Sequence, residues 1–327
     1  MLRCYTHLNG QLVEAPDPSS GDQPPNIVWF DLLNPSREEE LQVETNLSLE
    51  VPTRAEMAEI ELSARLYHED GAQFMTMTAL SRLDADEPLK TPVTFILKGQ
   101  TLVTVRYADS KPFLQFGMRA QRPNAAIYTS GEQVMMGLIE AMIDRIADAL
   151  EKVGDEIDAI SRAVFRTQGT RAMKSHDLQA AIEQIGRKGD LLTMIQEALV
   201  SLARVVAYHS VPDGVQGKAA KETRQRGRQI QRDATSLREH ASFLSSKVTF
   251  LLDATLGLIN LEQNQIIKIF SVAAVVFLPP TLVASIYGMN FAIMPELHLP
   301  FGYPMALGLM VLSAILPFAY FKRRGWL

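Results

Sequence analysis

Hydrophobic and polar residues are distributed very differently along the two parts of this chain. Up to about residue 265 the chain mixes charged and apolar residues as water-soluble proteins do, whereas the remainder is almost wholly apolar. Two apolar runs stand out in that remainder, at 269–287 and at 303–321. Each is long enough to cross the hydrocarbon core of a bilayer as a helix. We therefore predict two transmembrane spans joined by a loop at 288–302.

The basic residues around these runs predict how the chain is oriented. Lys268 precedes the first run, Lys322, Arg323 and Arg324 follow the second, and the loop at 288–302 contains neither Lys nor Arg. Segments on the cytoplasmic side of a membrane are enriched in Lys and Arg. The first residues of the chain also lack the apolar core of a signal peptide. We expect both termini in the cytoplasm, the loop outside, and the spans in the lipid of the inner (plasma) membrane.

The pattern upstream of the spans predicts strands first and helices afterwards. Period-two and β-branched runs indicate strands at 2–8, 27–33, 72–83, 92–97 and 101–107. Start signals and helical periodicity indicate helices at 36–46, 53–60, 131–166, 175–208 and 218–287. The predicted fold class is α+β. Its parts are a cytosolic α/β domain at 1–130, a helical region with a long stalk helix at 131–265, and a transmembrane domain at 266–327.

One face of the first span, continued into the helix that precedes it, is mostly polar or small. Its members are spaced by seven and then alternately by four and three: Asp253, Asn260, Asn264, Ile267, Ser271, Ala274, Leu278, Thr281 and Ser285. A polar face inside a membrane must point at protein or water. Two helices cannot enclose a channel, but several copies around an axis can. The alternative is that small residues only allow close helix packing.

Charge and composition exclude several classes of function. The net charge is −5, which argues against a nucleic-acid partner, and the single Cys4 excludes a disulfide framework or a cysteine metal site. An acidic stripe (144, 148, 151, 155, 158) and a basic segment (218–238) indicate contrasting helix faces. We find no nucleophile elbow, no His-Glu-x-x-His and no phosphate loop, so we expect neither an enzyme nor a bound cofactor.

The end of the first span carries the most specific motif. It reads Tyr287-Gly288-Met289-Asn290, and Met294-Pro295-Glu296-Leu297 follows in the loop. The chain closes on Trp326-Leu327 after its basic tail, and Trp29-Phe30-Asp31-Leu32 lies near its start. These segments resemble the CorA family of magnesium and cobalt channels. The resemblance implies a homopentamer whose pore is lined by the polar face and whose selectivity filter is Gly288, Met289 and Asn290.

The resemblance also implies the ions and their control. Mg²⁺ would be the main ion, with Co²⁺ and Ni²⁺ also passing. A ring of Asn290 amides would hold hydrated ions, which suits an ion that is reluctant to lose its water. Glu296 would attract cations to the outer loop. Cytosolic Mg²⁺ would close the pore, and Asp84, Asp86 and Glu87 form the most suitable acidic cluster for a regulatory metal.

Two alternatives stay open from the sequence. The first is a zinc transporter of the same fold, coupled to protons. Zn²⁺ prefers His, Cys or carboxylate ligands, and the first span has none of these. The second alternative is an enzyme or scaffold that the two spans merely anchor in the membrane.

Overall fold

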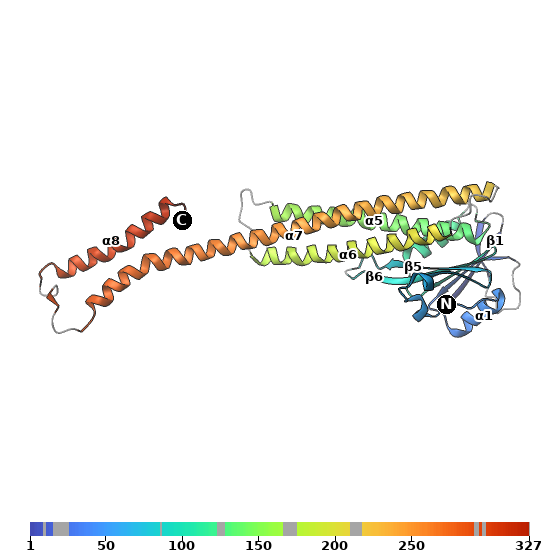
Figure 1. Cartoon of the computed structure of the whole chain (residues 1–327), viewed down its shortest axis with the longest axis horizontal. Helices are drawn as coiled ribbons and strands as arrows, with labels where there is room; N and C mark the ends of the chain where they lie inside the picture. Colours follow the sequence, from blue (N-terminus) through green and yellow to red (C-terminus); the bar gives the residue numbers. More distant parts are fainter. Residues whose placement is uncertain are drawn as a thin grey trace. The chain divides into compact units, whose positions relative to one another are not determined.

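The computed structural model describes residues 1–8, 11–15, 26–85, 87–122, 128–165, 175–209, 218–290, 294–295 and 299–326 (Figure 1). The chain divides into two compact units. One comprises Met1–Arg166 and Glu183–Leu251, and the other comprises Thr167–Ile182 and Leu252–Leu327.

A seven-stranded sheet forms the centre of the first unit. The strands are β1 (Leu2–Leu8), β2 (Gln11–Ala15), β3 (Ile27–Leu33), β4 (Leu66–Glu69), β5 (Ala72–Ser81), β6 (Leu89–Lys98) and β7 (Thr101–Arg106). Their order is β2-β1-β3-β7-β6-β5-β4, and all described neighbours are antiparallel except the parallel pair β3 and β7. The five predicted strands are confirmed. The short strands β2 and β4 were not predicted.

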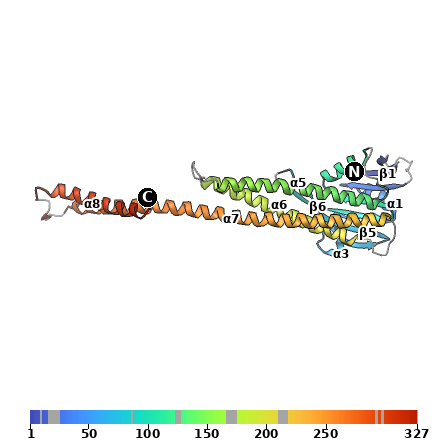
Figure 2. The same ribbon diagram turned by 90° about the horizontal axis from the view of Figure 1, so that it is seen from above.

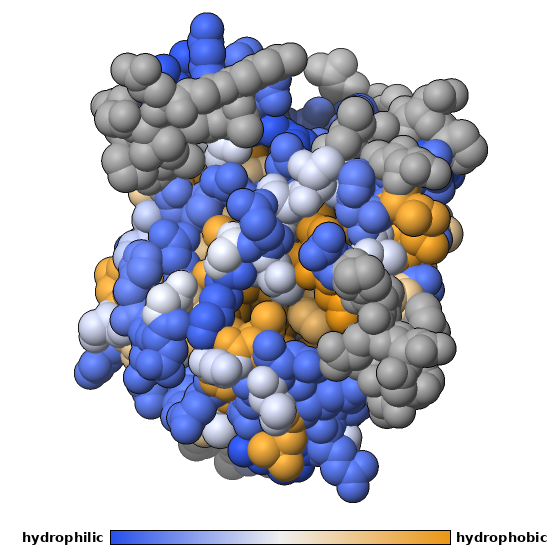
Figure 3. Space-filling view, turned by 90° about the vertical axis from the view of Figure 1, so that its right-hand side faces the viewer, coloured by the Kyte–Doolittle hydropathy of each residue, from blue (hydrophilic) through white to orange (hydrophobic). Residues whose placement is uncertain are grey.

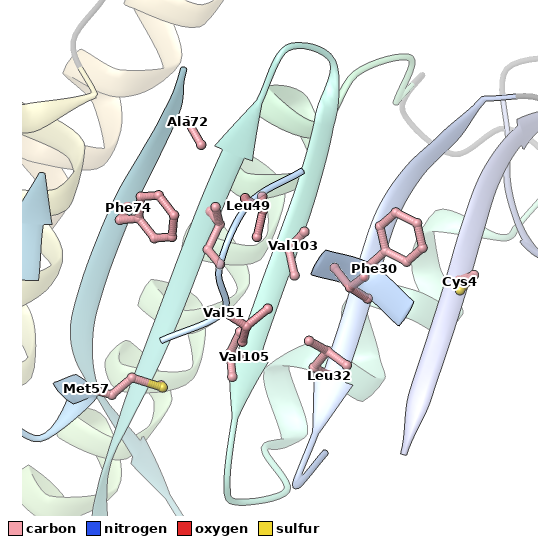
Figure 4. Packing of buried hydrophobic residues seen from close by; sticks show 12 residues of the cluster. Cys4, Phe30, Leu32, Leu49, Val51, Met57, Ala72, Phe74, Val103 and Val105 are labelled. Carbon is pink, nitrogen blue, oxygen red and sulfur yellow. The ribbon is translucent and has the colours of Figure 1, made fainter. Parts of the chain in front are cut away.

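Side chains of successive residues of β3 point to opposite faces of this sheet, because a β-strand is pleated. Phe30 and Leu32 pack with Val103 and Val105 of β7 on one face, and Figure 4 shows this cluster together with Leu49, Val51 and Met57. Trp29 points to the other face, where its ring meets Phe116 edge-on at 5.8 Å. Both faces are therefore covered by other elements of the same unit.

Four short helices border the sheet: α1 (Arg37–Leu47), α2 (Arg54–Met57), α3 (Leu62–Arg65) and α4 (Lys111–Ala120). Ser36 and Glu39 form a capping box at the start of α1, and Thr53 and Glu56 form another at the start of α2. The helix predicted at 53–60 ends at Met57, so that prediction was too long. The helix α4 was not predicted, although Pro112 stands in its first turn.

Three long helices follow: α5 (Gly131–Phe165), α6 (Ser175–Tyr208) and α7 (Lys218–Tyr287). All three were predicted to within one residue. Figures 1 and 2 both show α5, α6 and the first part of α7 running together. Two ion pairs join α5 to α7. Arg226 of α7 binds Glu140 of α5, and Lys247 of α7 binds Asp158 of α5.

In the second unit, α8 (Gly302–Arg323) runs back beside the end of α7 (Figures 1 and 2). Three helical segments are long and apolar enough to cross a membrane: Asp177–Tyr208, Lys221–Tyr287 and Gly302–Arg323. The most apolar stretch of the first is 44% buried inside the protein, whereas the other two are only 6% buried. The first therefore serves as a core helix, and the other two contain the predicted spans.

The hydropathy of the protein surface also differs between the two units. On the face seen in Figure 3, hydrophilic residues predominate and hydrophobic residues form small separate patches. By contrast, large apolar side chains are exposed all along the end of α7 and along α8, among them Phe270, Phe277, Leu282, Leu312 and Leu316. An apolar surface of this extent needs lipid or another protein to cover it.

Candidate functional site

The polar face predicted on α7 is exposed along its whole length within the described structure. All nine residues from Asp253 to Ser285 that define this face, named here the α7 stripe, are exposed. The two largest apolar members, Ile267 and Leu278, are 60% and 65% exposed. The α7 stripe lies entirely within the second unit. The fold of a single chain therefore leaves this face uncovered.

The opposite face of α7 is the shielded one. Its least exposed residues in the membrane part recur at helical spacing: Val272, Val276, Pro279, Pro280, Val283 and Tyr287. At 3.6 residues per turn, this set lies about half a turn away from the α7 stripe. We attribute the shielding to α8, which runs back beside this part of α7 in Figures 1 and 2 and whose Ala306 is buried. The helix α8 thus leaves the α7 stripe free.

The two prolines do not interrupt α7, which stays helical to Tyr287. Proline has no N–H, so the carbonyls of Val275 and Val276 receive no bond from residues 279 and 280. The Thr281 hydroxyl donates to the Phe277 carbonyl at 2.7 Å. This hydroxyl is therefore anchored to its own helix, and its oxygen lone pairs stay available to accept from a water molecule.

The Gly-Met-Asn motif begins where α7 ends. The Gly288 N–H donates to the Ala284 carbonyl at 2.9 Å, and the Met289 N–H donates to Ile286 at 3.3 Å. A Cβ at Gly288 would come within 3.0 Å of the Ala284 oxygen. Asn290 is exposed, and its side chain makes no hydrogen bond to the rest of the described chain. Glu296 lies outside the described residues.

The acidic cluster proposed for a regulatory metal already has partners. The Asp84 carboxylate binds the Lys111 ammonium and the Arg145 guanidinium, and these two cations lower the pKa of Asp84 to about 2. Glu87 is exposed, and Asp86 lies outside the described residues. Across the described part of the chain, no three His, Cys, Asp or Glu side chains are grouped so that they could hold a metal ion. A metal at Asp84 would have to displace both cations.

Sequence reasoning missed this pairing. Arg145 is 61 residues away from Asp84 in the sequence, and a local pattern gives no sign of such a contact.

The Trp-Phe-Asp-Leu segment of β3 contributes to a buried hydrogen-bond network in the sheet. Asp31 is 3% exposed and forms two hydrogen bonds with the Arg106 guanidinium, at 2.9 and 2.7 Å. The Thr104 hydroxyl donates to the same carboxylate at 2.8 Å and accepts from the Trp29 indole N–H at 2.9 Å. This network ties β3 to β7 at the centre of the sheet.

Comparison with known proteins gives a consistent result. The family model of the CorA-like Mg²⁺ transporter protein matches residues 25–323. The magnesium transport proteins CorA of Escherichia coli (strain K12) and of Salmonella typhimurium are each 38% identical to this chain, over 304 and 305 residues, with 92% of each chain covered. These relatives are transporters and not enzymes.

Solved structures share the fold. The complete CorA magnesium transporter of Methanocaldococcus jannaschii matches with a TM-score of 0.79 at 18% identity, covering 100% of this chain and 99% of the other. The full-length CmaX protein matches with a TM-score of 0.69 at 14% identity, covering 99% and 97%. The predicted α+β fold with two C-terminal spans is thereby confirmed. The chain belongs to the CorA-like Mg²⁺ transporter family.

Proposed function

We propose that several copies of this chain form a membrane channel that passes divalent cations, chiefly Mg²⁺ and also Co²⁺ and Ni²⁺. The family membership supports divalent cation transport. The observation that carries the pathway is the α7 stripe, which is exposed in the chain and faces away from α8. Copies arranged around an axis would bring their α7 stripes together and enclose a polar path. The proposal of five copies per channel comes from the family resemblance.

Asn290 would select the ion at the outer end of this path. Its amide oxygens carry no net charge, so a ring of them would hold a hydrated cation through its water shell and still release it. A ring of carboxylates would hold the ion more tightly. Glu296, in the loop beyond, would raise the local cation concentration. Both spans would lie in the inner membrane, with the termini in the cytoplasm and 266–327 as the membrane domain.

Two apolar members of the α7 stripe would narrow the path. Ile267 and Leu278 are about three turns apart along α7, so each would form its own ring in an assembly. Apolar rings can gate a channel by excluding water. Cytosolic Mg²⁺ would favour the closed form by binding near Asp84, Asp86 and Glu87. The cost of displacing Lys111 and Arg145 from Asp84 would keep this regulatory affinity low.

The proposal is tested by Mg²⁺ flux into liposomes that contain the purified protein. Asn290→Ala removes the amide of the proposed filter. Gln265→Ala is the matched control, because Gln265 is also an exposed amide of this region but lies on the side of α7 away from the stripe. We expect the wild type and Gln265→Ala to carry Mg²⁺ and Asn290→Ala to lose flux or selectivity.

Other outcomes would point elsewhere. Equal flux and equal selectivity in Asn290→Ala would remove Asn290 from the filter. Zn²⁺ flux that follows a proton gradient, with little Mg²⁺ flux, would favour the zinc transporter. Folded wild-type protein that carries no divalent ion would contradict the channel.

A further inference from the structure

A hollow of about 560 Å³ lies between α5 and α6 in the first unit, far from the membrane spans in the sequence. Its floor is apolar and is made largely of buried side chains, including Ala149, Val153, Ile160 and Leu191. The residues that follow β5, among them Leu83 and Asp84, line one part of it. Its size is within the range of pockets that bind small organic molecules.

Charged groups from both helices line the rim of this hollow. The four cations are Arg145, Lys152, Arg187 and Lys188, and the three anions are Asp84, Asp148 and Glu156. Two ion pairs account for part of this set. Arg145 of α5 binds Asp84, and Lys188 of α6 binds Glu156 of α5, which joins the two helices across the hollow.

Two cations remain after these pairs are counted. Lys152 of α5 and Arg187 of α6 are exposed, and neither has an acidic partner within 4.0 Å among the described residues. Only Asp148 is left on the rim to balance them. The open part of the rim therefore carries an excess of positive charge, contributed from opposite helices above an apolar floor.

From this arrangement we infer that the α5–α6 hollow binds an organic phosphate of nucleotide size. The phosphate would lie between Lys152 and Arg187, since a guanidinium offers paired donors to phosphate oxygens and an ammonium adds a further charge. The apolar body of the ligand would pack against the apolar floor of the hollow beside Val153 and Leu191. Inorganic phosphate lacks this body and should bind more weakly.

This site does not depend on the proposed ion pathway, and its test does not measure transport. Calorimetric titration of the purified full-length protein would use ATP, AMP, adenosine and inorganic phosphate, in buffer with EDTA so that Mg²⁺ plays no part. A short-chain phosphatidic acid would be a further probe, because a lipid also joins a phosphate to an apolar body. The variants would be Lys152→Ala with Arg187→Ala, and the control Arg162→Ala, an exposed cation of α5 outside the hollow.

We expect ATP or AMP to bind the wild type and the Arg162→Ala control equally. The double variant should bind at least tenfold more weakly, and adenosine and inorganic phosphate should each bind more weakly than AMP. Binding of phosphatidic acid in place of the nucleotides, with the same loss in the double variant, would identify a lipid as the source of the phosphate. Failure of every phosphate ester to bind, or equal binding by the wild type and the double variant, would overturn the site. Both substituted residues are exposed, so the variants should fold.

Discussion

The two units of this chain differ in how much of their apolar surface is buried. The first unit covers both faces of its sheet and even buries a charged pair, Asp31 with Arg106, in which the carboxylate accepts three hydrogen bonds. In the second unit, most of α8 and most of α7 from residue 252 onward are exposed, and only one face of this part of α7 is shielded. The first unit therefore covers its own apolar surface, whereas the exposed apolar surface of the second unit needs lipid or another protein to cover it.

The largest expected effect tests the self-sufficiency of the first unit. Asp31→Ala leaves the buried Arg106 guanidinium without its partner, and breaking a buried pair in this way costs about 3–5 kcal/mol. Chemical denaturation of the full-length protein would measure the loss. Glu197→Ala is the control, because its pair with Lys90 is exposed and should contribute at most about 1 kcal/mol. Equal losses in both variants would mean that the buried network does not anchor the sheet.

The next effect sharpens the contrast within the second unit. Leu278 on the α7 stripe and Leu316 on α8 are 65% and 66% exposed. If Leu278 narrows a shared pore, Leu278→Ala should raise the ion leak of liposomes several-fold. The shorter alanine side chains would leave a wider opening, which water and ions enter more easily. Leu316→Ala makes the same substitution on a surface assigned to lipid and should leave the leak unchanged. A larger leak from Leu316→Ala would reverse the assignment of the two faces.

A smaller effect concerns the hydrogen bonds in the first unit. Trp29→Phe keeps an aromatic ring in the core but removes the N–H that donates to Thr104. We expect the free energy of unfolding to fall by about 1 to 2 kcal/mol from the lost bond and the smaller ring. Leu41→Ala, at an exposed position of α1, is the comparison and should change the stability far less. No loss in Trp29→Phe would show that the indole N–H is not part of the network.

The smallest effect is on the dependence of stability on pH. The pKa of Asp84 in the folded protein is about 2, below its ordinary 3.8, because Lys111 and Arg145 favour the carboxylate. A lowered pKa adds stability that is present above pH 3.8 and is lost as the pH falls through about 2. Asp84→Asn should therefore flatten the acid limb of the stability curve. An unchanged curve for Asp84→Asn would mean that the ion pairs do not persist in solution.

Sequence reasoning succeeded where a short repeat dictates the structure. The predicted helix at 218–287 is confirmed as α7, whereas the pore-lining role of the nine residues on one of its faces stays a prediction. The bounds of α5, α6 and α7 followed from start signals and helical periodicity. The spans followed from length and hydropathy, because lipid requires a long apolar helix.

The same reasoning failed where distant segments decide the outcome. Strand β4 has only four residues and owes its place to pairing with β5. The ion-pair partners of Asp84 lie on α4 and α5. Asp158, in the acidic stripe of α5, forms an ion pair with Lys247 of α7. The α5–α6 hollow is likewise made by packing two helices, and no single helix predicts a cavity.

The most direct test of the proposed pathway is the reaction of introduced cysteines with a water-soluble thiol reagent in the membrane. The native Cys4 is buried and can be replaced by Ser for this purpose. Ala274 on the α7 stripe and Ala319 on α8 are both exposed and lie near the same end of their spans. Ala274→Cys should react and lose Mg²⁺ flux as it does so, whereas Ala319→Cys should stay unreacted in lipid. Reaction of Ala319→Cys alone, with Ala274→Cys protected, would contradict a pore along α7.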